Sequence, residues 1–459
     1  MQKSVSFEIG IWKIRNDQTV PAETRLYKLK KKYFSVFLSY LFVLILYFYY
    51  LSIILDNMYL ERTHLHNSIS QAQSQRRMVL VTGIRRSGKT ALLRNVIQSM
   101  RSSRPPIRIV HIEPDSEGWT GRRLVNEAKA LGVGPSALVI DNAERIGTLA
   151  EALAEIERRH APWMMISGIR TRQLEEILGS RFAPLVVRVS PFSYPEFLSF
   201  TGMTDSSTAF SLYTRRGGIP ENLSYIGDES LSLRVRALAA DSFILTEILE
   251  NGPVRNPRHL KKVLSLVVRY SGENLPARQI CAALAADRIS ISPQSAVDYL
   301  DAARKSGLIV PVPAYDISKR KILETGTVRF CADTGFREPF LAGIPVSVHS
   351  ETDHAVENCI FLSLQSSFDL VYRGRVDLDS RNREEVSFVC EGGGKRVYIQ
   401  IIGSSTGLRA SERKKKALLS IRDGWKKILV SNGPEGTGED GILTVSPRKL
   451  LLGGIPDQG

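Results

Sequence analysis

The stretch "MVLVTGIRRSGKTALL" (Met78–Leu93) joins a short apolar run to a glycine-rich turn that ends in Lys and Thr. Four residues separate Gly83 from Gly88, and Lys89 and Thr90 follow directly, which is the spacing of a phosphate-binding loop. The residues before the turn predict a strand, and "TALLRNVIQSM" after it has helical periodicity. This order of strand, loop and helix is the context that such a loop requires.

The residue types of the loop suit a nucleotide bound together with a magnesium ion. Gly83 and Gly88 let backbone N–H groups turn toward a polyphosphate at the start of the following helix. The Lys89 ammonium would reach the outer phosphates, and the Thr90 hydroxyl would bind Mg²⁺. We therefore expect ATP and Mg²⁺ as cofactors, and the predicted nucleotide-binding residues of the loop are Gly83, Arg86, Ser87, Gly88, Lys89 and Thr90.

A second apolar strand with an acidic end occurs in "PSALVIDNAERI". Ser136–Ile140 predicts a buried strand, and Asp141 at its end would hold Mg²⁺ together with Thr90. Ser167 ends another predicted strand, where it either senses the γ-phosphate or is an ordinary strand-end serine. Helical patterns alternate with these strands, which predicts an α/β fold with a parallel sheet. The remaining strands are expected in Ile107–Pro114, Pro162–Gly168 and Pro184–Pro191.

Length, charge and cysteine usage bound the class of protein. At 459 residues the chain can form about three domains, each with its own core. The formal net charge of +15 favours an acidic partner, such as nucleic acid or an anionic membrane surface, or serves general solubility. The four cysteines lie far apart with no CxxC pair, so the sequence indicates neither a zinc site nor a disulfide framework. We expect a cytoplasmic protein.

The first 57 residues differ in composition from the rest. Residues 33–55 carry no charge and are long enough to span a bilayer, which makes a membrane anchor one hypothesis. Lysines precede this span and acidic residues follow it, so the positive-inside tendency would place the phosphate loop outside the cell. Lys predominates over Arg before Met58, and Arg predominates over Lys beyond it. The other hypothesis is therefore a spurious N-terminal extension, with the true start at Met58.

Four motifs, taken in order, resemble those of a large prokaryotic family of AAA-type ATPases that carry a C-terminal domain of unknown function. The motifs are "GIRRSGKT", "SPFSYPEFLSF" (Ser190–Phe200), "YTRRGGIPENL" (Tyr213–Leu223) and "RFCADTGFREPFL" (Arg329–Leu341). The resemblance extends from about Met58 to about Asn432. It implies an ATPase whose cellular task is mostly undefined.

One departure from the family concerns the residue after Asp141. Similar proteins usually have Glu there to polarise the attacking water, whereas this chain has Asn142, which can orient a water but cannot take its proton. ATP binding should survive this change, while hydrolysis is in doubt. Glu144 could substitute if the loop folds it back, or could be a solvated helix-start residue. By loose resemblance, Arg181 is either an arginine finger or a surface arginine.

The middle of the chain predicts a winged-helix unit. Ile280 and Leu284 mark its first helix, a turn follows, and a second helix presents Val297, Leu300 and Ala303 before the strand "GLIVPV". Some winged-helix units bind DNA, and others serve as protein contacts. The presumed recognition helix has acidic residues and little basic charge, which disfavours reading of bases.

The last third resembles the restriction-endonuclease-like domain of the same family. "HAVENCIFLSL" matches its first helix with Glu357, and "EEVSFV" and "VYIQII" match its two central strands. A nuclease of this kind needs an acidic residue on the first strand and an acid-x-Lys on the second. Ser387 and Gln400-Ile401-Ile402 stand there instead. We predict a degenerate nuclease fold without nuclease activity.

Together these features predict an ATP-binding AAA-type protein that is either a slow ATPase or a nucleotide-controlled switch. Its partner would be a protein or a nucleic acid. Two alternatives stay open: a tether with a structural nucleotide, and a membrane-anchored ATPase. The predicted parts are an N-terminal extension (1–57), an AAA-type domain (58–205), a helical linker with a winged helix (206–325) and a nuclease-like domain (326–459).

Overall fold

The computed structural model describes residues 60–102, 107–114, 118–169, 171–249, 256–342, 347–378 and 382–455. Among these residues there is no helix both long and apolar enough to cross a membrane. The predicted span at residues 33–55, and with it the whole N-terminal extension, lies outside the described part of the chain.

A five-stranded parallel sheet forms the first part of the described chain, as the alternating pattern predicts. Its strand order is β2-β4-β6-β1-β7, and every pair is parallel. The strand that leads into the phosphate loop, β1, therefore lies between β6 and β7. The strands are β1 (Val79–Thr82), β2 (Arg108–Ile112), β4 (Ser136–Ile140), β6 (Trp163–Gly168) and β7 (Leu185–Arg188).

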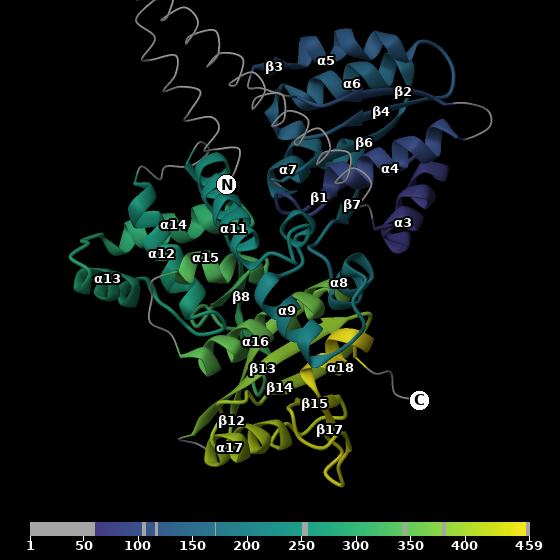
Figure 1. Cartoon of the computed structure of the whole chain (residues 1–459). Coiled ribbons are helices and arrows are strands. Elements are labelled where there is room, and N and C mark those ends of the chain that lie inside the picture. The colour runs from purple at the N-terminus through teal and green to yellow at the C-terminus, as the bar shows by residue number, and fades with distance from the viewer. Residues whose placement is uncertain are drawn as a thin grey trace, which may run out of the picture. The chain divides into compact units, whose positions relative to one another are not determined.

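Helices cover both faces of this sheet, which explains why its strands are apolar without alternation. Leu80 of β1 packs into the core on one side, and its neighbours Val79 and Val81 pack into the core on the other. Figure 1 shows α5 and α6 on the first face and α3 and α4 on the second. The bounds are α3 (Thr63–Ser74), α4 (Lys89–Arg101), α5 (Gly121–Glu127), α6 (Leu149–His160) and α7 (Thr171–Phe182).

A helical segment follows β7. Its helices are α8 (Tyr194–Thr201), α9 (Ser207–Arg216), α10 (Pro220–Leu223), α11 (Glu229–Phe243), a π-helix (Ile244–Leu249), α12 (Pro257–Arg269), α13 (Ala277–Ala286) and α14 (Pro293–Lys305). Helices α11 to α14 form a separate apolar core, whereas α8 and α9 pack into one of the cores of the C-terminal part. Ile280 and Leu284 of α13 are buried, as expected. Leu300 and Ala303 of α14 are buried as expected, but Val297 is 46% exposed and Ala296 is buried instead.

The C-terminal part contains an eight-stranded mixed sheet in the order β10-β9-β12-β13-β14-β15-β17-β16. Two apolar cores lie on its faces, one with α16 and α18 and the other with α17. Figure 1 labels α16 (Val348–Ser367), α17 (Leu408–Leu419), α18 (Pro447–Gly453), β12 (Leu370–Asp377), β13 (Arg383–Gly392), β14 (Lys395–Ile401), β15 (Lys426–Val430) and β17 (Leu443–Val445). The edge strand beside β17 is β16 (Gly436–Thr437).

Strand pairing crosses the predicted boundary at residue 326. After α14, β8 (Ile309–Val312) pairs with β11 (Val328–Cys331), which lies beyond that boundary. Between them, β9 (Ala314–Asp316) and β10 (Lys321–Ile322) join the C-terminal sheet at the free side of β12. The helical segment and the C-terminal part therefore exchange strands with each other.

Candidate nucleotide site

The phosphate loop connects the end of β1 to the start of α4, and its glycines are required by its path. Gly83 has φ 152°, and a Cβ there would lie 2.2 Å from the carbonyl oxygen of Val189. Gly88, the residue before α4, has φ 100°, a conformation that L side chains rarely adopt. The loop thus presents the N-terminal end of α4, which favours an anion.

Lys89, the first residue of α4, is 6% exposed and turns back into the loop. Its Nζ atom donates hydrogen bonds to the carbonyl oxygens of Gly83 (3.0 Å) and Ile84 (2.9 Å). The cation is therefore held at the position where the loop would receive phosphate oxygens. A buried ammonium in contact with phosphate makes a charge-assisted interaction, roughly twice as strong as a neutral hydrogen bond.

Three of the predicted site residues meet at the carboxyl end of the sheet. The Thr90 hydroxyl donates a 2.6 Å hydrogen bond to Oδ2 of Asp141. The Ser167 hydroxyl donates to Oδ1 of the same carboxylate, and the Asn142 N–H donates to Oδ1 at 3.0 Å. Asp141 and Ser167 are both fully buried. A carboxylate beside a threonine hydroxyl supplies the oxygen ligands that Mg²⁺ prefers, with water and phosphate completing its shell.

The residues after Asp141 form a tight turn. Asn142 adopts the left-handed conformation (φ 51°, ψ 48°), which asparagine tolerates better than most residues. Glu144 folds back toward the end of β6, where its Oε1 accepts a 3.3 Å hydrogen bond from the Ile169 N–H. A Cβ on Gly168 would lie 2.3 Å from Glu144 Oε2, so the glycine leaves room for this carboxylate. Glu144 therefore lies at the end of β6, beside Gly168, the residue that follows Ser167.

Arg86 of the loop contacts a residue that the sequence did not suggest. Its Nη1 atom lies 3.1 Å from Oε1 of Glu221, in the short helix α10. Pro220, the first residue of α10, is next to the loop as well, because its Cγ lies 4.0 Å from the Cβ position of Gly88. The motif "GGIPE" carried the family resemblance, but nothing in the sequence assigned it to the phosphate loop.

Arg181 lies away from the other predicted site residues. It belongs to α7, which runs back from the carboxyl end of β6 toward the beginning of β7. Two residues later, the Ala183 carbonyl oxygen accepts a 3.2 Å hydrogen bond from Arg77, just before β1. Arg181 itself is half exposed and lies 3.5 Å from Glu157. Within one chain, Arg181 therefore lies near the amino end of the strands, whereas the phosphate loop lies at their carboxyl end.

The sheet, the loop and the acidic strand end define a P-loop nucleotide-binding domain of the AAA type. Residues 75–198 match the family described as AAA domain. This match covers the loop, Asp141, Ser167 and the start of the following helical segment.

Two solved structures are similar to the chain over part of its length. A Walker-type ATPase of Pyrococcus abyssi has 16% identity, covers 61% of this chain and 95% of its own, and has a TM-score of 0.45. A DNA polymerase III gamma subunit-related protein of Thermotoga maritima has 12% identity, covers 41% and 62%, and has a TM-score of 0.24. No curated protein matches the chain. At these values neither structure indicates a partner for this chain.

Proposed function

We propose that the chain binds MgATP at the phosphate loop and acts as a nucleotide-controlled switch on a protein partner. The observation that carries the proposal is the hydrogen bond between Thr90 and Asp141, beside Lys89 at the start of α4. It joins the two groups that would hold Mg²⁺ at the place where the loop would hold the phosphates. Gly83, Arg86, Ser87 and Gly88 complete the proposed nucleotide site.

The site favours slow turnover. Asn142 has no basic oxygen at neutral pH, so it can position a water but not accept its proton. Glu144 is the nearest described carboxylate on the same turn, but its contact with the Ile169 N–H holds it against the end of β6. A long-lived ATP state follows, which suits a switch better than a motor. Arg181 would act as an arginine finger only on a neighbouring copy of the chain, because in its own chain it lies near the amino end of the strands, away from the phosphate loop.

A protein partner is favoured over DNA by the charges of α14. Asp301 pairs with Arg304 (2.6 Å) and with Lys305 (2.8 Å), so both basic residues at the end of this helix share an acidic partner within the helix. We propose that α13, α14 and the β8–β11 pair form a winged helix used for a protein contact. An exposed Val297 on α14 agrees with that use, since a base-reading helix would need free basic or amide side chains there.

The basic helix α17 gives no more support to nucleic-acid binding. Arg413 pairs with Glu384 at 3.0 Å, and Lys415 pairs with Asp440 at 2.8 Å. Lys414 turns inward and donates a 2.9 Å hydrogen bond to the Ile401 carbonyl oxygen. Most of the charge that the sequence places on this helix is therefore used within the C-terminal part.

We propose that the C-terminal part is a nuclease-like fold without a working metal site. Arg373 of β12 lies between Glu357 (2.6 Å) and Glu385 (3.4 Å), so a guanidinium already pairs with both of these carboxylates. The Gln400 side-chain oxygen accepts a hydrogen bond from the Ser387 N–H, and the Ser387 hydroxyl accepts one from the Ile401 N–H. Neither position therefore offers a carboxylate to a metal. A guanidinium thus occupies the place of a metal cation.

The test of the proposal is a titration with a fluorescent ATP analogue, with and without Mg²⁺, on wild type and Lys89→Ala. Losing a charge-assisted contact costs about 1.5–3 kcal/mol, so we expect a weakening of roughly tenfold or more. Arg181→Ala is the matched control, since that cation lies away from the loop. Equal affinities of wild type and Lys89→Ala would remove the proposal.

A further inference from the structure

The turn Gly217-Gly218-Ile219-Pro220, between α9 and α10, lies against the phosphate loop. As described above, its last residue is next to Gly88, and the following Glu221 pairs with Arg86. The position of this turn therefore decides where α10 meets the loop.

On its other side the turn rests on a single buried carboxyl group, that of Asp333. The Gly218 N–H donates a 2.7 Å hydrogen bond to Asp333 Oδ2, across 115 residues of sequence. Asp333 Oδ1 accepts a second hydrogen bond, of 2.8 Å, from the Gly335 N–H. Asp333 is 1% exposed, so water cannot replace these bonds.

Neither glycine of the turn has room for a side chain. Gly217 has φ 73°, and a Cβ there would lie 1.9 Å from Asp333 Oδ1. A Cβ on Gly218 would lie 2.1 Å from the carbonyl oxygen of Phe192. Phe192 in turn donates its N–H to the Gly218 carbonyl oxygen at 2.7 Å. The turn is thus clamped between Phe192 and Asp333.

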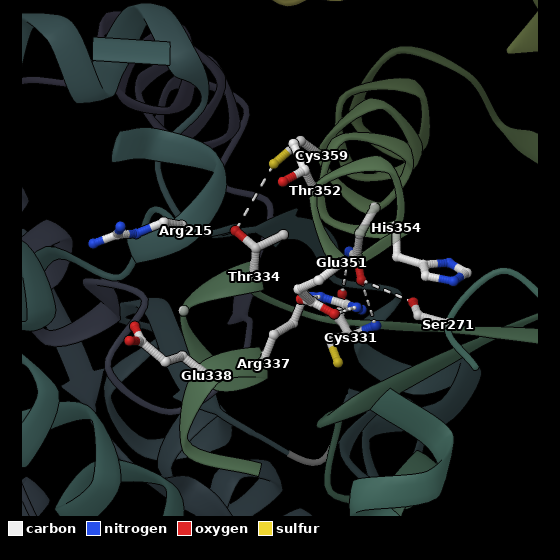
Figure 2. Close-up of polar contacts among 12 residues, drawn as sticks. Arg215, Ser271, Cys331, Thr334, Arg337, Glu338, Glu351, Thr352, His354 and Cys359 are labelled. Carbon is white, nitrogen blue, oxygen red and sulfur yellow. Dashed lines mark hydrogen bonds and ion pairs between the residues drawn. The ribbon is translucent and has the colours of Figure 1, made fainter. Parts of the chain in front are cut away.

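The segment that carries Asp333 is fixed to α16 of the C-terminal part. Cys331 exchanges two hydrogen bonds with the Asn358 side chain, one from its N–H (3.0 Å) and one to its carbonyl oxygen (2.8 Å). Arg337, the first residue of α15 (Arg337–Leu341), makes two 2.7 Å bonds to the Glu351 carboxylate. Figure 2 shows Arg337 beside Glu351 and a dashed line between Thr334 and Cys359 of α16.

We infer that Asp333 is a positioning residue for nucleotide binding: from a segment anchored on α16, it holds the Gly217–Pro220 turn against the phosphate loop. The inference rests on the proposed function, since it concerns the affinity of the same site. Without the carboxyl group, two buried N–H groups lose their acceptor, and the turn loses its fixed position. Because coupling is reciprocal, a nucleotide in the loop should in turn stabilise the Asp333 segment.

The first test compares nucleotide affinities by the same fluorescence titration. Asp333→Ala should weaken ATP binding about tenfold, within the usual range of coupling between sites, and Asp333→Asn, which keeps one acceptor oxygen, should weaken it less. Asp316→Asn is the matched control, because Asp316 is a buried aspartate (2% exposed) in β9 whose Oδ1 accepts the Lys319 N–H instead. Circular dichroism establishes that each variant is folded.

The outcomes separate the inference from the proposed function. If wild type and Lys89→Ala bind ATP equally, the proposed function fails. If Lys89→Ala loses binding while folded Asp333→Ala keeps wild-type affinity, the inference alone is overturned.

The second test needs no variant of Asp333 and covers the case in which Asp333→Ala does not fold. Hydrogen exchange of wild type should slow at the Gly218 and Gly335 amides when MgATP is added. Lys89→Ala should show no such change. Exchange at both amides that stays the same under saturating MgATP in wild type would overturn the inference.

Discussion

The Thr90 hydroxyl and the Asp141 carboxylate, 51 residues apart in the sequence, are joined by a 2.6 Å hydrogen bond at the carboxyl end of the parallel sheet. This bond sets the distance between the two groups that would share a magnesium ion. A hydroxyl that donates its hydrogen to a carboxylate keeps its oxygen lone pairs for Mg²⁺, so both groups can bind the ion with little movement.

Thr90→Ala should therefore make nucleotide binding insensitive to Mg²⁺. The change removes one oxygen ligand but leaves Lys89 and the backbone of the loop in place. The measurement is the ratio of ATP affinities with and without Mg²⁺, which should fall toward one in the variant. Thr90→Ser, which keeps the hydroxyl, is the control, and a variant that keeps the wild-type ratio would disprove the role of Thr90.

Asn142→Glu should raise the rate of ATP hydrolysis and leave ATP affinity little changed. A general base contributes on the order of 10² to 10⁴ in rate, and a glutamate at this turn would supply one. Steady-state phosphate release measures the effect. Asn142→Gln, whose side chain has the length of glutamate but no charge, is the control.

A fast wild-type enzyme would contradict this assignment of Asn142. If wild type already turns over at about 1 per second or faster, within the common enzyme range, and Asn142→Glu adds nothing, another residue activates the water. Glu144→Gln would then abolish turnover, since Glu144 is the carboxylate on this turn that lies at the end of β6.

Stability should decrease with rising pH because of Asp333. Burial raises the pKa of Asp333 from 3.8 to about 7, although hydrogen bonds from Gly218 and Gly335 and the nearby Arg236 act in the opposite direction. Between those two values the folded protein holds one more proton than the unfolded chain. The free energy of unfolding should therefore fall by about 1.4 kcal/mol per pH unit across this window.

Asp333→Asn isolates this contribution, because an amide does not titrate. Urea unfolding of wild type and Asp333→Asn at pH 5 and pH 8 gives four free energies of unfolding. Wild type should lose more stability than the variant between the two pH values. Parallel losses in both proteins would show that Asp333 titrates as an ordinary surface carboxyl group.

Arg373→Met should destabilise the protein by about 3–5 kcal/mol, the cost of leaving buried charges without their partner. Arg373 is 12% exposed and Glu357 is 16% exposed, so neither is well solvated. The neighbouring Glu357 and Glu385 outweigh the effect of burial and raise the pKa of Arg373. Adding Mn²⁺ should restore part of the lost stability to Arg373→Met and none to wild type, as measured by thermal unfolding.

Wild type should also cleave no DNA in the presence of Mg²⁺ or Mn²⁺. Lys414, near the same carboxylates, has its pKa lowered by burial and is bonded to a backbone carbonyl, so it is not free to assist a water. Metal-dependent cleavage of plasmid DNA that is lost in Glu385→Ala would refute the proposal that the nuclease-like fold has no nuclease activity.

The parallel sheet and the centre of the site follow from the sequence because they depend on local patterns. Apolar runs buried on both faces indicate the strands, and the carboxyl ends of parallel strands lie at one edge, which brings Thr90, Asp141 and Ser167 together. The matched AAA domain covers this part.

The rest of the site depends on contacts that no local pattern encodes. Glu221 reaches Arg86, and Asp333 reaches Gly218, only because of the path that the helices take between them. Arg181 resembles an arginine finger by its sequence context, but the direction of α7 places it near the amino end of the strands, away from the phosphate loop. On α14, Leu300 and Ala303 are buried as predicted, but Ala296 takes the buried position expected for Val297.

The pairing of β8 with β11, and of β9 with β12, determines where the chain can be divided. A cut at residue 326 would separate β8 from β11 and would strip β9 and β10 from the C-terminal sheet. Each fragment would then expose strand edges with unpaired N–H and C=O groups, which promote aggregation. Neither the helical segment nor the C-terminal part is therefore a self-sufficient module, and gene fusions or truncations that treat residue 326 as a linker should yield insoluble products.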